Sequence, residues 1–378
     1  MPHAENETMQ LLQIIFIFMF IKINGIKTMK SIFKSSMAIV CLALMLSSCQ
    51  KEDFELSSNA NDMLHVKNGD YLIPVLVRGN TASKKIILFI QGGPGINTLD
   101  FAEIDYPGWK NTLEKEYAVA YYDQRGTGNK QGNFSLDQIS MEIYIDDLHK
   151  VASFLKKAYN AEIVMMGHSF GGELMYRYML SHNSDDVPEK YIGLDGPATN
   201  DVDSLRWTFR REFLYNTANL EIASNRNVNE WNEVLTWLSF TPVIETNEDK
   251  DQWNLYVEEL VYIYYGEKPI TFGNVVESIF TASYNPFPAY LKDVEKMNSK
   301  LFEDIYAFNL ISKLSGINQE ILIITGRYDD VCTPEEMNYV YDQISSQFKQ
   351  LEIIEDAGHE SFYHQPEVFT SLVINYVQ

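Results

Sequence analysis

A serine between glycines follows a short apolar run near the middle of the chain, and this order of residue types can support nucleophilic chemistry. Ile163 to Met166 (I-V-M-M) has the apolar density of a strand buried on both faces. Gly167 to Gly171 then reads G-H-S-F-G, which fits G-x-S-x-G, and apolar residues recur at helical spacing from Leu174 to Met179. Strand, tight turn and helix are the setting of a nucleophile elbow, because the turn lifts the serine hydroxyl above the sheet edge. Ser169 is therefore the candidate nucleophile.

The partners that a serine nucleophile needs come from two later loops. A base must take the hydroxyl proton, and a carboxylate must hold that base in the right tautomer. Asp329 and Asp330 follow the apolar run Ile321 to Thr325, and His359 follows the last predicted strand, Gln350 to Ile354. The order serine, acid, histidine is that of the α/β-hydrolases and differs from the orders in chymotrypsin and subtilisin. We therefore expect His359 to be the general base and one of the two aspartates to orient it.

Main-chain N–H groups near the serine are candidates for an oxyanion hole. Phe170 would open the helix after the serine, so its N–H would face the developing negative charge. Lys84 to Ile90 is a predicted buried strand that runs into Q-G-G-P-G, and a glycine cluster after a central strand leaves backbone donors free to face a ligand. We expect the second donor to be the N–H of Gly92 or Gly93. These groups predict acyl transfer through a covalent acyl-enzyme.

Three other side chains compete for these roles. His168 is next to the serine, but in a strained turn we expect it to point into the protein and pack. His364 is expected to be an ordinary surface residue, and Cys332 a buried thiol rather than a second nucleophile. The sequence holds no clustered His, Cys and Asp spacing typical of a metal site and no phosphate-loop pattern. We therefore expect neither a metal nor a cofactor.

Three motifs in order resemble the proline iminopeptidase branch of the α/β-hydrolases: G-G-P-G at Gly92–Gly95, D-Q-R-G-T-G at Asp123–Gly128 and G-H-S-F-G-G at Gly167–Gly172. The likeness covers most of residues 84–378. It implies an α/β-hydrolase fold, with a mostly parallel central sheet flanked by helices and an inserted helical cap. The family pattern G-x-x-D implies that Asp329, rather than Asp330, is the acid.

The same resemblance gives further residues a role and contains one departure. The family motif is usually H-G-G-P-G, and this chain has Gln91 where the histidine stands. That change keeps the backbone donors and alters the fine shape of the loop. The D-Q-R-G turn is expected to brace the loop near the site through Asp123 and Arg125, with no direct catalytic role for either.

The alternation of strands and helices breaks in residues 198–300, which hold four of the five tryptophans. We expect this stretch to be the helical cap, and residues 62–197 and 301–378 to form the hydrolase core. The resemblance implies that cap carboxylates bind the free α-amine of a substrate. The cap offers five candidates, none of which can be matched to a family position: Glu212, Glu230, Glu233, Glu258 and Glu259.

Residues 1–49 read as an export leader, and the polar residues 50–61 as a flexible tether. From Met29, Lys30 and Lys34 lead into the apolar run Met37 to Leu46, and L-S-S-C ending at Cys49 resembles a bacterial lipobox. That resemblance implies a lipidated Cys49, a true start at Met29, and residues 1–28 upstream of it. The working domain would then be lipid-anchored to a bacterial membrane, at the outer membrane or cell surface rather than free in the periplasm. The alternatives are an uncleaved anchor in residues 11–46 or an incidental cysteine.

The composition excludes some partners and leaves others open. The 378 residues carry a formal net charge of −22, which repels phosphate backbones, so nucleic acid is not expected as a partner. Three cysteines, Cys41, Cys49 and Cys332, cannot build a disulfide framework once the leader is considered. The sequence leaves the oligomeric state open.

Residues and resemblance together predict a serine hydrolase whose substrate is a small peptide or ester. The implied activity is release of an N-terminal residue, proline first among candidates, from short peptides. An esterase or lactonase using the same three side chains is the first alternative, favoured if the pocket lacks paired carboxylates. The second is a protein that keeps the fold and binds a ligand without catalysis, against which the complete set of three side chains argues.

Overall fold

The computed structural model describes residues 58–127, 138–182, 188–199, 204–266 and 309–378. All of them belong to one compact unit, Leu56–Gln378. The predicted leader, residues 50–57 of the predicted tether and residues 267–308 lie outside the described part of the chain. Among the described helices, none has both the length and the apolar character needed to cross a membrane.

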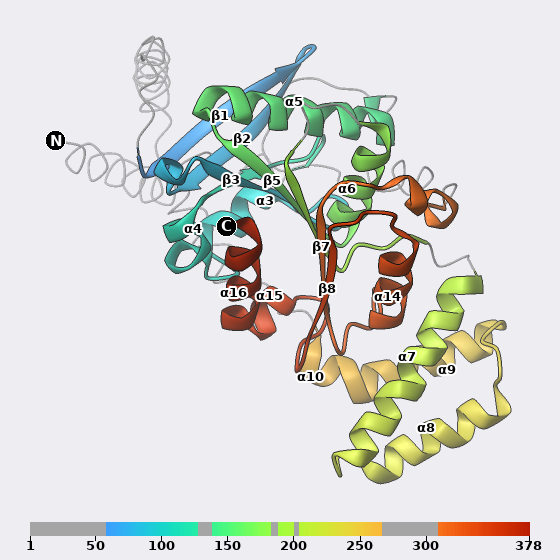
Figure 1. The fold of residues 1–378 in the computed structure, drawn as a ribbon. Helices are drawn as coiled ribbons and strands as arrows, with labels where there is room; N and C mark the ends of the chain where they lie inside the picture. Colours follow the sequence, from blue (N-terminus) through green and yellow to red (C-terminus); the bar gives the residue numbers. More distant parts are fainter. Residues whose placement is uncertain (1–57, 128–137, 183–187, 200–203, 267–308) are drawn as a thin grey trace, which may run out of the picture. The chain divides into compact units, whose positions relative to one another are not determined.

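An eight-stranded sheet forms the centre of the described core, in the order β1-β2-β4-β3-β5-β6-β7-β8 (Figure 1). Its strands are β1 Ala60–Asn68, β2 Tyr71–Gly79, β3 Lys85–Ile90, β4 Ala118–Tyr122, β5 Glu162–His168, β6 Lys190–Leu194, β7 Ile321–Gly326 and β8 Lys349–Ile354. Strands β3 to β8 pair in parallel, whereas β2 pairs antiparallel with both β1 and β4. The prediction of a mostly parallel sheet is therefore confirmed.

Successive side chains of the central strands enter two separate cores, one on each face of the sheet. In β3, Ile86, Leu88 and Ile90 join one core, and Ile87 and Phe89 join the other. The first core packs under α5 Met141–Tyr159, α6 Phe170–Ser181 and α14 Pro334–Gln343 (Figure 1). The second packs under α3 Thr98–Glu103, α4 Leu113–Glu116, α15 Ser361–His364 and α16 Pro366–Val377. Burial on both faces explains why these strands read as continuous apolar runs.

Local sequence signals fix where the flanking helices begin and end. The Ser140 hydroxyl accepts a hydrogen bond from the Ile143 N–H at the start of α5, and Asn160 ends that helix in the left-handed conformation. At α14, Thr333 accepts from the Glu336 N–H, and Pro334 occupies a first-turn position where its missing N–H costs nothing. The cap at Thr333 therefore fixes where the loop between β7 and α14 ends.

The antiparallel edge is a hairpin with a two-residue turn. Asn68 pairs with Tyr71, and Gly69 in the turn has a φ of 62°, which glycine adopts without strain. The two strands pair along their whole length, from Ala60 opposite Gly79 to the turn. Because β1 begins at Ala60, residues 60 and 61 belong to a strand and not to the tether.

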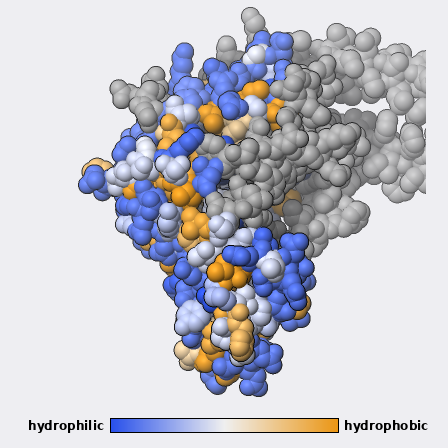
Figure 2. Space-filling view, turned by 90° about the vertical axis from the view of Figure 1, so that its right-hand side faces the viewer, coloured by the Kyte–Doolittle hydropathy of each residue, from blue (hydrophilic) through white to orange (hydrophobic). Residues whose placement is uncertain are grey.

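Helices after β6 pack around a third, separate core. They are α7 Ser204–Ala223, α8 Val228–Phe240 and α9 Asn247–Val257, followed by a π-helical turn Glu258–Tyr262 and α10 Ile263–Tyr265 (Figure 1). Three of the four tryptophans in residues 198–300, Trp207, Trp231 and Trp253, are buried in this cluster. Apolar side chains also remain exposed among polar ones on these helices (Figure 2). The described part of residues 198–300 is therefore mainly helical. The predicted end of the cap, at residue 300, lies outside the described residues and stays a prediction.

Candidate active site

The turn between β5 and α6 holds Ser169 in a backbone conformation that few side chains adopt. Its φ is 54° and its ψ is −123°, which costs a residue with a Cβ on the order of 1–3 kcal/mol. The flanking glycines make this turn possible. A Cβ on Gly171 would lie 2.0 Å from the Ile90 carbonyl oxygen, and a Cβ on Gly167 would lie 2.4 Å from the Gly171 carbonyl oxygen. The strand–turn–helix context predicted for G-x-S-x-G is therefore present.

The G-G-P-G loop after β3 lies against this serine. A Cβ on Gly92 would be 2.8 Å from the Ser169 Cβ and 3.4 Å from its Oγ, so only a glycine fits there. Gly93 next to it has a φ of 112°, in the region that favours glycine. Phe170 is the first residue of α6, where an N–H has no acceptor within the helix. Gly92 and Phe170 thus adjoin the serine, and Gly93 follows Gly92 in the same loop.

Two loops at the carboxyl ends of β7 and β8 bring an acid and a base together. The Nδ1 of His359 lies 2.9 Å from Oδ2 of Asp329, and both side chains are buried. The other oxygen of Asp329 accepts hydrogen bonds from the N–H groups of Val331 (2.8 Å) and Cys332 (2.9 Å). Burial alone would raise the pKa of Asp329, but the charge and hydrogen bond of His359 outweigh it and lower that pKa. Asp329 is therefore charged at neutral pH.

The neighbouring Asp330 is not the partner of the histidine. Burial and the charge of Asp329 raise the pKa of Asp330 to about 6. Its side chain is partly exposed, whereas Asp329 is fully buried. Of the two aspartates left open by the order of residues, Asp329 is the one that contacts His359.

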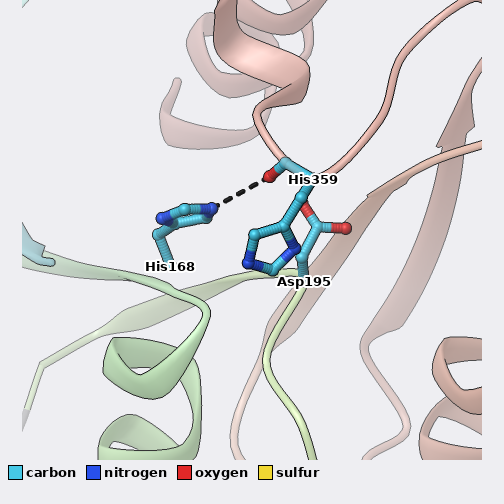
Figure 3. A group of neighbouring side chains, drawn as sticks. All are labelled: His168, Asp195 and His359. Atoms are coloured by element: carbon cyan, nitrogen blue, oxygen red, sulfur yellow. Dashed lines mark hydrogen bonds between the residues drawn. The ribbon is translucent and has the colours of Figure 1, made fainter. Parts of the chain in front are cut away.

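His168 joins the elbow to the histidine loop. Its ring is buried, as predicted, and its Nε2–H donates to the main-chain carbonyl oxygen of His359 at 2.9 Å (Figure 3). Burial lowers the pKa of His168 to about 3, so the ring is neutral in this contact. The ring also meets Phe362 edge to face at 5.1 Å. Because Ser169 is the next residue in the chain, this hydrogen bond fixes the position of His359 relative to the serine.

A second buried carboxyl group, Asp195, was not predicted from the sequence. It directly follows β6, its N–H donates to the Ile324 carbonyl oxygen of β7 at 3.1 Å, and its φ is 51°. Figure 3 shows its carboxyl group beside the His359 ring. The ligand atoms of His168, Asp195 and His359 lie within 4.8 Å of one another, a spacing compatible with a metal ion. Hydrogen bonds of His168 Nε2 and His359 Nδ1 already account for the positions of both rings.

The D-Q-R-G turn braces the surroundings of the site, as predicted. Oδ1 of Asp123 accepts hydrogen bonds from the N–H groups of Thr98 and Leu99 at the start of α3, at 2.9 and 3.1 Å. Arg125 forms a buried ion pair with Asp147 of α5 at 2.7 Å. The residue between these two, Gln124, was given no role in the sequence analysis. Nε2 of Gln124 donates to the Gln91 carbonyl oxygen at 2.7 Å, so Gln124 holds the strand end that leads into the glycine loop.

The five predicted substrate-binding glutamates, Glu212, Glu230, Glu233, Glu258 and Glu259, all have exposed side chains. A different glutamate of these helices is buried. Glu221 pairs with Arg226 and accepts a hydrogen bond from the Tyr328 hydroxyl at 2.6 Å. Tyr328 directly precedes Asp329, so this contact ties α7 to the acid loop.

The structure also shows the surroundings of His364 and Cys332, the other two side chains considered as alternatives for the catalytic roles. His364 is half-buried rather than on the surface, because its ring packs against Tyr265 and Tyr363. Burial lowers the pKa of His364. Cys332 is a buried free thiol, as expected, and burial raises its pKa well above the usual value. A thiol with a raised pKa is a poor nucleophile.

Known proteins resemble this chain over most of its length. The sequence pattern of the alpha/beta hydrolase fold family matches residues 85–366. The chain is 18% identical over 313 residues to the probable aminopeptidase YbaC of Bacillus subtilis (strain 168), a likeness that covers 79% of this chain and 90% of that protein.

Solved structures share the fold at low sequence identity. The proline iminopeptidase of Mycobacterium smegmatis matches with a TM-score of 0.53 and 17% identity, over 84% of this chain and 97% of that one. An esterase from Exiguobacterium antarcticum matches with a TM-score of 0.52 and 17% identity, over 83% and 98%. A proline iminopeptidase-related protein from Thermus thermophilus matches with a TM-score of 0.52 and 15% identity, over 84% and 96%. Since the family pattern spans well over half of the sequence, the chain belongs to the alpha/beta hydrolase fold family.

Proposed function

We propose that the protein is a serine hydrolase in which Ser169 is the nucleophile, His359 the general base and Asp329 the orienting acid. The observation that carries this proposal is the 2.9 Å contact between His359 Nδ1 and Asp329 Oδ2 in loops that adjoin a strained elbow serine. A carboxylate on Nδ1 leaves Nε2 of the imidazole to take the serine proton.

The reaction proceeds through an acyl-enzyme. The Ser169 oxygen attacks the substrate carbonyl carbon while its proton passes to Nε2 of His359. The oxyanion that forms accepts hydrogen bonds from the Phe170 N–H and from the N–H of Gly92 or Gly93. The imidazolium returns its proton to the leaving amine or alcohol, the C–N or C–O bond breaks, and a water molecule then hydrolyses the acyl-serine by the reverse sequence of proton transfers.

The preferred substrate in this proposal is a short peptide with a free N-terminal residue, proline first. Support comes from the order of the three motifs and from relatives described as a probable aminopeptidase and as proline iminopeptidases. An esterase or lactonase that uses the same triad is the second candidate. It is favoured by the exposure of the five cap glutamates and by the pairing of the buried Glu221 with Arg226, which leaves that carboxylate unsuited to a substrate amine.

A fluorophosphonate probe tests the nucleophile in the full chain. We expect the wild type to be labelled, Ser169→Ala to be unlabelled, and Asp330→Asn to label at nearly the wild-type rate. Asp329→Asn should label far more slowly, since loss of a triad acid costs about 10⁴ in turnover in a serine protease. Equal labelling of wild type and Ser169→Ala would reject the serine nucleophile, and no labelling of the wild type would favour the ligand-binding alternative.

A matched pair of substrates separates peptide from ester activity. We would compare kcat/KM for proline β-naphthylamide with that for a p-nitrophenyl acyl ester, and subtract the rates of Ser169→Ala. A higher Ser169-dependent value for the amide supports the aminopeptidase. Ester turnover without measurable amide turnover supports the esterase.

Lipid anchoring through Cys49 belongs to the same proposal, together with placement at a bacterial outer membrane or cell surface. It rests on the basic segment, the apolar run and the lipobox-like L-S-S-C of the sequence. Incorporation of a labelled fatty acid into the wild type, and its loss in Cys49→Ser, is the expected result. Equal incorporation, or none in either protein, would reject it.

A further inference from the structure

Two buried carboxyl groups meet behind His359. Asp195 ends β6 and Asp329 follows the neighbouring strand β7, and both have 0% exposed surface. Both carboxyl groups approach the same ring: Oδ2 of Asp329 is 2.9 Å from His359 Nδ1, and an oxygen of Asp195 lies within 4.8 Å of a ring nitrogen of His359. Each carboxyl group also affects the pKa of the other. Two carboxylates this close together inside a protein do not both ionise readily, because neither charge is solvated and the two repel. We therefore expect the pair to hold one proton.

The surrounding donors determine which group keeps that proton. Asp329 accepts three hydrogen bonds, from the Val331 and Cys332 N–H groups and from His359 Nδ1. The donors near Asp195 are the Thr325 hydroxyl and the Gly326 N–H, which lower its pKa slightly. Among the described residues, neither oxygen of Asp195 accepts a well-formed hydrogen bond. Donors stabilise a carboxylate, so the negative charge belongs on Asp329 and the proton on Asp195.

We propose that Asp195 is a positioning residue, whose carboxyl O–H donates a hydrogen bond to Asp329 and leaves Asp329 as the single carboxylate facing His359. This inference rests on the proposed serine-hydrolase mechanism, to which it adds a fourth side chain. No proton moves between the two carboxyl groups during turnover, because Asp195 keeps its proton throughout. The role of Asp195 is to hold Asp329 in place and to moderate its charge.

The pKa directions agree with that assignment. Burial and the charge of Asp329 raise the pKa of Asp195 well above its usual value, against smaller downward effects of Thr325 and the Gly326 N–H. A hydrogen bond from Asp195 contributes to the lowered pKa of Asp329. His168 and His359 are the titratable side chains beside Asp195, and Asp329, Tyr176 and Cys332 are near enough to interact with it electrostatically. Of these groups, Asp329 is the one that carries a negative charge at neutral pH.

Removing the donor should change the pH profile in a definite direction. Without the O–H of Asp195, the Asp329 carboxylate is less neutralised and stabilises the His359 imidazolium more strongly. The pKa of His359 then rises, and the acid limb of kcat/KM moves to higher pH. For Asp195→Ala we expect a move of roughly one pH unit and a loss of about tenfold in kcat/KM near neutral pH.

The variant Asp195→Asn distinguishes a hydrogen-bonding role of Asp195 from a role in packing alone. Asp195→Asn keeps the shape and supplies an amide N–H to Asp329, so it should recover most of the activity lost in Asp195→Ala and return the acid limb to lower pH. An infrared difference spectrum at pH 7, wild type minus Asp195→Asn, should contain the C=O band of a protonated carboxyl group. Other buried acids are common to both proteins and cancel.

Two results would overturn the proposal. If Asp195→Asn is as inactive as Asp329→Asn, Asp195 acts as a charged acid and not as a donor. If the infrared difference contains no protonated carboxyl band, the proton is elsewhere; this measurement decides the matter even if Asp195→Ala fails to fold. The infrared readout needs no turnover, so it stays valid if Ser169→Ala retains activity and the hydrolase mechanism itself fails.

Discussion

The side chain of His168 holds the main chain of His359, through an Nε2–H that donates to its carbonyl oxygen at 2.9 Å. The contact links the residue before the serine to the proposed base, 191 positions later. A displacement of the imidazole by even 1 Å is enough to lower turnover by about 10² in an enzyme of this kind. In the proposed mechanism, His168 would therefore act on the reaction through the position of His359.

Replacement of His168 tests that coupling. His168→Leu keeps an apolar side chain in the site but removes the donor, so we expect kcat to fall between about 10- and 100-fold with a smaller change in KM. His168→Gln supplies an amide donor and should recover part of the loss. Steady-state kinetics on the better of the two substrate classes measures both. Equal activities of the leucine and glutamine variants would show that the hydrogen bond is unimportant.

His168 also makes the fold sensitive to acid. The pKa of His168 is lowered to about 3 in the folded chain, against 6.5 for the exposed group, so below pH 6.5 the unfolded state binds a proton that the folded state cannot. Stability is lost as the pH falls from about 6.5 towards 3, and at pH 5 this one group accounts for about 2 kcal/mol. Urea unfolding at pH 7.5 and 5 should reveal a smaller drop for His168→Leu. Equal drops in both proteins would contradict this.

The strained backbone of Ser169 predicts a stability gain on its loss. At a φ of 54° and ψ of −123°, glycine is free of the Cβ clash that serine and alanine both carry. Ser169→Gly should unfold with a free energy about 1 kcal/mol higher than Ser169→Ala, although both lack the nucleophile, because relief of strain exceeds the entropy cost of glycine. Chemical denaturation of the two inactive variants measures the difference. A less stable glycine variant would mean that the elbow carries no strain.

Gly92 is the position where a single methyl group should disturb the oxyanion hole directly. The added Cβ of Gly92→Ala would meet the Ser169 Cβ at 2.8 Å and the His168 carbonyl oxygen at 3.1 Å, so the loop or the serine must move. Displacing one backbone donor should lower kcat by about 10²–10³. Gly316→Ala is a matched control, because its Cβ meets only a leucine methyl group, at 3.0 Å. Similar losses in both variants would point to general misfolding instead.

From the sequence we could predict those residues of the candidate site that directly follow a strand with a recognisable pattern. Ser169, Asp329 and His359 each follow an apolar run, and parallel strands bring such positions to one sheet edge. The same reasoning could have found Asp195, which follows the strand between those of Ser169 and Asp329. It was missed because it lacks a motif, and a lone aspartate before a glycine reads as a turn.

Contacts between distant segments were beyond the reach of sequence patterns. Glu221 and Tyr328 are 107 residues apart, and their hydrogen bond depends on how the helices after β6 dock against the β7 loop. Periodicity identifies helices in that region but not which glutamate is buried. His364 was misplaced for a similar reason, because the aromatic ring that covers it, Tyr265, comes from the end of α10.

The bond between Glu221 and Tyr328 gives the last prediction. The Tyr328 hydroxyl donates to Glu221 at 2.6 Å and accepts from Arg226 at 2.9 Å, while its ring stacks on Tyr265 at 4.2 Å. Tyr328→Phe keeps the stacked ring and removes both hydrogen bonds. The helices after β6 should then hold the acid loop less firmly and bind substrate less well. We expect KM to rise severalfold with little change in kcat, and the free energy of unfolding to fall by about 1 kcal/mol.

Tyr159→Phe is the matched control, because the Tyr159 hydroxyl donates to Asp62 at 2.8 Å and joins α5 to β1, far along the chain from the acid loop. It loses a comparable tyrosine–carboxylate hydrogen bond and should lower stability by a similar amount without raising KM. If both variants raise KM alike, the effect reflects general loosening of the fold. If Tyr328→Phe lowers kcat and leaves KM unchanged, the contact acts on Asp329 itself, because that residue is next in the chain and orients the base in the proposed mechanism.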